Sequence, residues 1–178
     1  MLVGLASAAI STPSRADTTE LRAVRPTLTG KEVIRDGFHF QVLFGWGGGP
    51  DSLGVFHAME IGGTLGNGVT LALIHTFIQN KGIAGQHGGP DLFGGWMPEI
   101  KFPLFFDDLI VKIAIGPGGI HDQSNGIRAI PGLAWLYGID YHLPFFRRSG
   151  MTLSAQMLHA WVRKHHFGFA IALGYTFF

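Results

Sequence analysis

The chain of 178 residues contains no cysteine, which excludes disulfide bonds, thiolate nucleophiles and zinc sites built on cysteine. Charge is also scarce: Asp, Glu, Lys and Arg make up 14% of the residues, against roughly 25% in a typical soluble domain. The net charge of +1 provides no basic surface of the kind that nucleic-acid binding requires. With 47% hydrophobic residues, the chain has much apolar surface to bury and few charges for a water-facing shell.

An apolar transmembrane helix is not supported by the sequence either. The longest charge-free stretch, residues 61–80, reaches the length of about 18–20 residues that a helical span needs. Its first half, however, contains the turn-forming residues Gly62, Gly63, Gly66, Asn67 and Gly68. This cluster favours two strands joined by a hairpin, and a helical membrane protein is the lesser alternative.

The N-terminal region divides into two predicted segments. Residues 1–16 combine a short apolar run, Leu2 to Ile10, with the small-x-small sequence Ser14-Arg15-Ala16, as at the end of a secretory signal peptide. The positively charged start of such a peptide is missing, so the expected peptide is truncated or begins elsewhere; a disordered tail is the alternative. Residues 17–36 are polar and are expected to form an unstructured periplasmic lead-in.

A period of two dominates from residue 37 to the end. Large apolar residues at Phe38, Phe40, Val42, Phe44 and Trp46 alternate with small or polar ones. Since alternate side chains of a strand point to opposite faces, this pattern is typical of a membrane barrel strand with its apolar face outward. It predicts eight strands, at residues 38–46, 55–65, 69–78, 92–104, 109–117, 127–143, 151–162 and 167–177.

The spacing of these segments agrees with a barrel that crosses a bilayer. Most have about 9–13 residues, near the 9–11 that a tilted strand needs. Connections at 66–68, 105–108 and 144–150 are expected to be periplasmic turns, and those at 47–54, 79–91 and 118–126 to be longer external loops. Pro98 and Pro131 fall inside strands, where proline removes a ladder donor, so either local bulges or different strand limits are expected there.

The C-terminal residues Phe169-Ala-Ile-Ala-Leu-Gly-Tyr-Thr-Phe177 resemble the terminal signature of bacterial outer-membrane proteins. Residues 38–178 as a whole resemble small eight-stranded barrels of the OmpA transmembrane-domain, OmpX or OmpW type. The resemblance implies a bacterial outer-membrane location and recognition of Tyr175, Phe177 and Phe178 by the barrel assembly machinery. It also implies contact with outer-membrane lipid and lipopolysaccharide. It leaves function open, because fold does not determine function.

Aromatic residues lie where two interfacial belts are expected. The sequence places Trp46, Trp96 and Trp161 at external strand ends, and Phe38, Phe102, Tyr141 and Tyr175 near periplasmic ends. A soluble all-β sandwich would instead bury these aromatics and present polar outer faces, which the first, fifth and eighth segments lack.

Six charged residues are predicted to point into the lumen: Glu60, Glu99, Lys101, Lys112, Arg128 and Asp140. Eight strands enclose a space just large enough for side chains, and buried charges are costly unless paired. The three acids and three bases therefore predict a salt-bridged plug. The alternative hypothesis is that these residues form a catalytic acid–base set.

Other polar motifs are weaker. Histidines cluster near the predicted external ends, with His57 and His75 as expected neighbours on the outer face, which would suit a metal or lipid-phosphate site or simple polar filling of the interface. The segment His121 to Asn125 has hydrolase-like residues but no identifiable triad, and Gly47 to Pro50 lacks the Lys and Ser/Thr of a P-loop. No catalytic residue, cofactor or metal ligand is predicted.

The sequence thus predicts a monomeric, eight-stranded, up-and-down antiparallel β-barrel of the bacterial outer membrane. Its expected role is structural or one of surface interaction through the external loops. A narrow passive channel for small solutes and an outer-membrane lipid-modifying enzyme are the alternatives.

Overall fold

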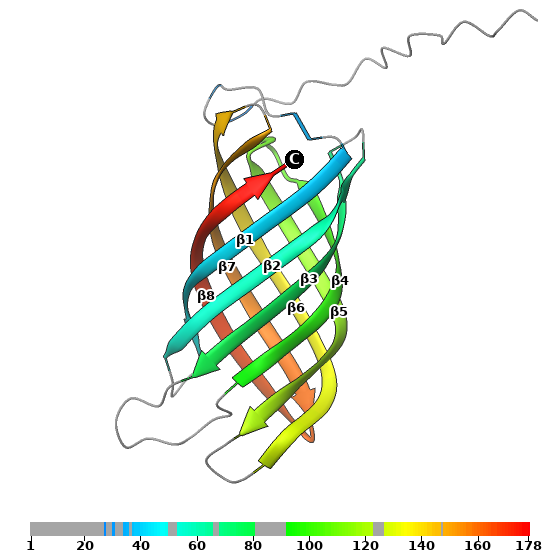
Figure 1. The fold of residues 1–178 in the computed structure, drawn as a ribbon, viewed down its shortest axis with the longest axis vertical. Coiled ribbons are helices and arrows are strands. Elements are labelled where there is room, and N and C mark those ends of the chain that lie inside the picture. Colours follow the sequence, from blue (N-terminus) through cyan, green and yellow to red (C-terminus); the bar gives the residue numbers. More distant parts are fainter. Residues whose placement is uncertain are drawn as a thin grey trace, which may run out of the picture.

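The computed structural model describes residues 27, 30, 34–35, 37–49, 53–65, 68–80, 92–122, 127–146 and 148–178. Their eight strands form one closed antiparallel barrel in which each strand pairs with its neighbour in sequence and β8 pairs with β1 (Figure 1). The predicted fold class is confirmed. The strands are β1 Gly37–Gly48, β2 Gly54–Thr64, β3 Thr70–Asn80, β4 Leu92–Pro103, β5 Leu109–Asp122, β6 Ile127–Phe146, β7 Ser149–Val162 and β8 Lys164–Phe177.

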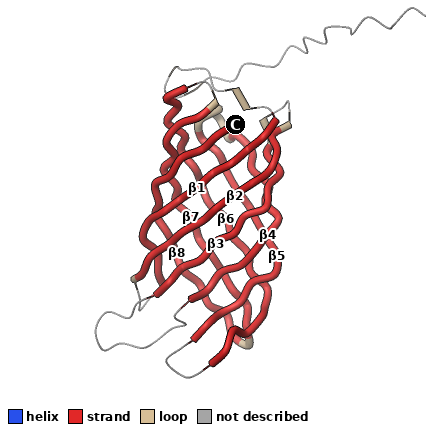
Figure 2. The backbone as a smooth tube through the Cα atoms, viewed as in Figure 1, coloured by secondary structure: helices blue, strands red, loops and turns tan. Residues whose placement is uncertain are grey.

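Strands account for nearly all of the described chain, as the tube view shows (Figure 2). Closure is made by β1 and β8, which pair from Phe40↔Phe177 to Gly48↔Phe169. A closed barrel leaves no sheet edge with unpaired backbone groups, which is the condition for crossing hydrocarbon with strands. No helix within the described residues is long and apolar enough to cross a membrane. The predicted signal peptide, residues 1–16, lies outside the described residues.

The period of two in the sequence becomes an outward and an inward face. On β1, Phe38, Phe44 and Trp46 are 59%, 64% and 69% exposed, whereas the alternating His39, Gln41 and Leu43 are buried. The same alternation runs along β8, where Phe169, Ile171 and Leu173 are exposed and Ala170 and Ala172 are buried. The outer face is therefore apolar and the inner face is small, polar or charged in this part of the barrel.

Two connections are shorter than the sequence predicted. β5 continues through Gly118 and Gly119 to Asp122, because those glycines pair with β4 and β6 instead of forming a loop. β6 continues to Phe146 and β7 begins at Ser149, with a register shift between Pro144 and Phe146. The start of β1, the end of β8 and the connections from β2 to β3, β4 to β5 and β6 to β7 lie at one end of the barrel (Figure 1). The ends of β3 and β5 and the one-residue connection between β7 and β8 lie at the other. We refer to these ends as periplasmic and external.

Each of the two strand prolines Pro98 and Pro131 lies where the backbone pairing with one of its neighbouring strands is interrupted. The bulges expected at these two positions are absent. Pro98 pairs with Leu73 of β3, but the β4–β5 ladder is interrupted between Gly95↔Gly118 and Glu99↔Ala114 without a change of register. Pro131 pairs with Gly119 on β5, and the β6–β7 ladder starts only at Leu133. Since proline cannot donate a backbone hydrogen bond, a one-sided position is where a strand tolerates it.

Gly174 lies where β8 and β1, the two strands that close the barrel, approach each other closely. A Cβ added there would lie 1.8 Å from the carbonyl oxygen of Val42 and 2.8 Å from Leu43 Cδ2. We expect Gly174→Ala to lower the free energy of unfolding by about 1–3 kcal/mol, because the backbone must shift to admit the methyl group. Urea unfolding of the vesicle-inserted barrel, followed by tryptophan fluorescence, measures this.

Gly63→Ala is the matched control, because its added Cβ would meet only the Gly37 carbonyl oxygen, at 3.5 Å. It is expected to change the free energy of unfolding by no more than about 0.5 kcal/mol. Equal losses in the two variants would show that the close approach of β1 and β8 is not what requires glycine.

Candidate functional site

The barrel interior consists of two sections stacked along its axis. Toward the external end it is filled by apolar side chains, among them Phe56, Phe93, Met97, Leu136 and Leu158. Toward the periplasmic end it is filled by buried polar and charged side chains. The sequence prediction anticipated the polar section. It missed the apolar one, because large inward residues near the external ends were not separated from the outward set.

The polar section is built around four buried charges from four strands. Lys101 of β4 pairs with Glu60 of β2 and lies 3.1 Å from Asp140 Oδ2 of β6. Lys112 of β5 bridges the same two carboxylates, at 2.9 Å from Asp140 Oδ1 and 3.5 Å from Glu60 Oε1. Two acids and two bases thus alternate in one closed set, which we call the ion-pair core.

Neutral polar side chains surround the ion-pair core. Lys101 Nζ donates to Gln41 Oε1 at 2.7 Å, and Gln41 Nε2 donates to Thr176 Oγ1 at 2.8 Å. Ser154 donates its hydroxyl hydrogen to Asp140 at 2.6 Å, and His39 lies 3.3 Å from Glu60 Oε2. These contacts give Lys101, Asp140 and Glu60 neutral partners in the wall in addition to their ion pairs. Lys112 is held by its ion pairs with Asp140 and Glu60.

The remaining predicted lumen charges are placed differently. Glu99 is buried but outside the ion-pair core, and neither of its carboxylate oxygens has a hydrogen-bond partner within the described structure. The backbone of Arg128 belongs to β6, but its side chain lies outside the described residues. The structure therefore brings together four of the six predicted residues: Glu60, Lys101, Lys112 and Asp140.

An aromatic and a guanidinium close the periplasmic end of the polar section. The ring of Phe178 lies 5.2 Å from the ring of His39 and 5.1 Å from that of His142, and its backbone N–H donates to the Arg148 carbonyl at 2.7 Å. The guanidinium carbon of Arg35 is 5.0 Å from the Phe178 ring centre. Arg35 is buried, although sequence analysis placed it in an unstructured lead-in. Phe178, one residue beyond the predicted last strand, covers the lumen at this end.

Two histidine pairs lie on the outer face near the external end. The predicted pair His57 and His75 is present, with ring centres 6.1 Å apart, and His75 packs 4.2 Å from Trp96. A second pair was not anticipated: His159 Nδ1 and His165 Nε2 are 2.8 Å apart and both rings stack on Trp135. The signal that could have predicted this pair is that both histidines occupy outward positions, on β7 and β8, and are diagonal neighbours across the two paired strands.

Neither pair forms a metal centre by itself. Within the described part of the chain, no group of three or more His, Cys, Asp or Glu side chains is arranged to hold a metal ion. His121 of the hydrolase-like segment lies in β5, not in the loop where it was expected, and residues 123–126 lie outside the described residues.

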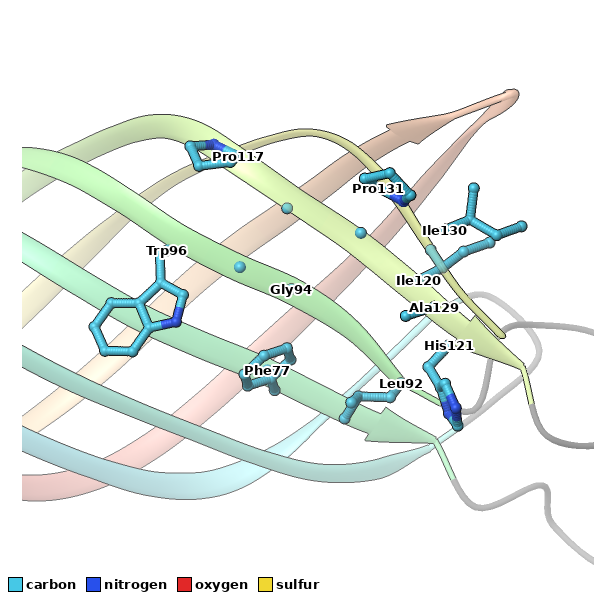
Figure 3. Close-up of a pocket in the computed structure, with 13 residues that line it drawn as sticks. Phe77, Leu92, Gly94, Trp96, Pro117, Ile120, His121, Ala129, Ile130 and Pro131 are labelled. Carbon is cyan, nitrogen blue, oxygen red and sulfur yellow. The ribbon is translucent and has the colours of Figure 1, made fainter. Parts of the chain in front are cut away.

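A groove of about 800 Å³ lies on the outer wall at the external ends of β3 to β6 (Figure 3). Phe77, Leu92 and Trp96 flank it on one side, and Ala129 and Pro131 flank it on the other. Its floor includes glycines of β4 and β5, and His121 lies at its loop end. Apart from His121 and Trp96, the side chains that line it are wholly apolar.

The outer surface carries a continuous apolar belt. Trp46, Trp96 and Trp161 are exposed toward the external end, and Phe38, Phe105 and Phe146 toward the periplasmic end, with aliphatic side chains between them. Aromatic rings at both rims of an aliphatic wall are typical of barrels that cross the outer membrane. A soluble sandwich would require these side chains inside.

Comparison with known proteins supports the fold and no more specific identity. No protein-family model matches the chain, and no curated protein matches it in sequence. The crystal structure of Neisserial surface protein A superposes with a TM-score of 0.50, covering 79% of this chain and 96% of that one at 12% sequence identity. The chain therefore has the fold of a small eight-stranded outer-membrane β-barrel, and its exposed aromatic belt is consistent with the bacterial outer membrane.

Proposed function

We propose that this protein is a non-conducting, monomeric barrel with a structural or surface-interaction role in the outer membrane. The observation that carries the proposal is the filled interior. The ion-pair core occupies the periplasmic section, and buried side chains such as Phe56, Phe93 and Leu136 occupy the external section. Eight strands enclose a space just wide enough for such a filling, so the lumen formed by the described residues offers solutes no continuous polar path.

A surface role follows from what the filled barrel leaves available. With the lumen closed by side chains, the external connections predicted from the sequence are the segments through which partners would be contacted. The rigid barrel would hold them at a fixed place above the membrane, as rigid scaffolds commonly hold functional loops. Outer-membrane lipid and lipopolysaccharide are the proposed surroundings of the wall.

Planar-bilayer recording of the purified barrel tests the closed lumen. We expect no single-channel steps at either polarity in concentrated potassium chloride, because ions would have to displace both an ionic and an apolar filling. Heat-modifiable mobility on a denaturing gel is the control that the inserted protein is folded. Reproducible steps from folded protein would contradict the proposal and favour the narrow passive channel.

A further inference from the structure

The outer-wall groove coincides with an unusual seam between β4 and β5. Two pairs of glycines face each other across it, Gly94↔Gly119 and Gly95↔Gly118. Immediately below, three register positions are unpaired, and Pro98 and Pro117 lie there on opposite strands. The seam therefore combines residues without side chains and residues without a backbone donor, which leaves a depression in an otherwise side-chain-covered wall.

Close packing of the strands prevents this depression from being filled by small substitutions. A Cβ added at Gly119 would lie 2.5 Å from the Ile130 carbonyl oxygen, and one at Gly94 would lie 2.0 Å from the Thr76 carbonyl oxygen. Real Cβ atoms essentially never approach so closely. The floor of the groove thus depends on glycine, and the groove belongs to the packing of the wall.

The groove faces the membrane. Trp96 is 46% exposed on its rim, while the inward neighbours Phe93 and Met97 are buried in the apolar section of the lumen. Alternation along β4 therefore directs Trp96 outward, and the groove is continuous with the apolar belt. Its volume of about 800 Å³ lies within the range of roughly 300–1,000 Å³ typical of ligand pockets.

The two ends of the groove differ in chemistry. Toward the middle of the barrel the groove is bounded by the apolar surfaces of Trp96 and Pro117. At the loop end it is bounded by His121 (Figure 3). An imidazole N–H can donate a hydrogen bond to a phosphate oxygen. A molecule that matches both ends has a hydrocarbon chain and a phosphate-bearing head at the outer rim.

We propose that this groove binds one acyl chain of a phosphate-bearing membrane lipid, with His121 beside the phosphate of its head group. The site differs from general contact between the belt and the bilayer, because it holds a single chain in a depression that the β4–β5 seam creates. The proposal is independent of whether the lumen conducts.

Filling the groove tests the proposal. Ala129 lines the groove and is exposed, so Ala129→Phe would occupy the space of an acyl chain; Ala155→Phe, at an exposed alanine of β7, is the matched control. The barrel in mild detergent is mixed with phosphatidylglycerol and analysed by native mass spectrometry. We expect a dominant one-lipid species in the unmodified and Ala155→Phe proteins. In Ala129→Phe it should fall about tenfold, since two buried methylene groups contribute about that factor.

Two further measurements keep the test decisive. His121→Ala is expected to weaken retention of phosphatidylglycerol while leaving that of diacylglycerol, which has no phosphate, unchanged. Should Ala129→Phe not fold, Ala129→Leu is examined by quenching of Trp96 fluorescence with brominated-chain lipid, in a barrel whose other three tryptophans are phenylalanine. A statistical spread of bound lipids, or equal retention in the Ala129 and Ala155 variants, would overturn the proposal.

Discussion

Replacing Lys101 with methionine is expected to lower the free energy of unfolding by about 3–5 kcal/mol. Lys101 is 1% exposed, and its ammonium group pairs with Glu60, lies 3.1 Å from Asp140 and donates to Gln41. Methionine has a similar shape but no charge, so the two buried carboxylates would share Lys112 as their only partner in the ion-pair core. The loss arises mainly from the uncompensated charge left behind.

Urea unfolding of the barrel in lipid vesicles measures this loss, and a double-mutant cycle shows its origin. Glu60→Gln combined with Lys101→Met removes one acid and one base, which leaves Lys112 and Asp140 paired at 2.9 Å. The double variant should therefore lose less stability than the sum of the two single variants, by about 0.5–3 kcal/mol. Strict additivity, or a loss below about 1 kcal/mol for Lys101→Met, would show that the ion pair is not what holds these strands together.

Much of this architecture could be predicted because a period of two records both faces of a strand at once. Outward Phe38, Phe44 and Trp46 and inward His39 and Gln41 are separated by alternation alone, and closure of eight such strands then follows from the need to pair every edge. The grouping of Glu60, Lys101, Lys112 and Asp140 also follows, because inward charges in a narrow lumen must find one another.

Other features depend on contacts that alternation does not encode. Near the external ends both faces are apolar, so Phe93 and Met97 could not be assigned to the lumen by contrast with Trp96. Gly118 and Gly119 have the composition of a loop, and it is their pairing with both neighbouring strands, β4 and β6, that makes them part of β5. Alternation after outward Phe177 places Phe178 inward, but it does not indicate that Arg35, His39 and His142, which lie far from it in sequence, are its partners.

The apolar section and the ion-pair core of the lumen differ in how strictly they restrict the side chains that can fill them. Apolar packing tolerates many combinations of side chains of suitable volume, whereas the ion-pair core requires particular partners on β2, β4, β5 and β6. A strand displaced by one residue would point its charge into lipid, so the core also disfavours wrong registers. We infer that the ion-pair core contributes to register as well as to closing the lumen.

Introducing a charge on the lipid-facing wall is expected to show how deeply each position lies in the membrane. Ile171 is in the middle of β8 and 55% exposed, between paired positions Trp46 of β1 and Ala155 of β7. Ile171→Arg should lower the free energy of unfolding in vesicles by about 2–4 kcal/mol, the cost of arginine near the bilayer midplane. Phe38→Arg, at the periplasmic start of β1 and 59% exposed, should cost only about 0–1 kcal/mol, because its guanidinium reaches the head groups. Both positions are similarly exposed, so packing alone predicts similar losses, and only a surrounding layer of hydrocarbon makes the loss depend on depth. Similar small losses at the two positions would mean that the belt does not contact lipid.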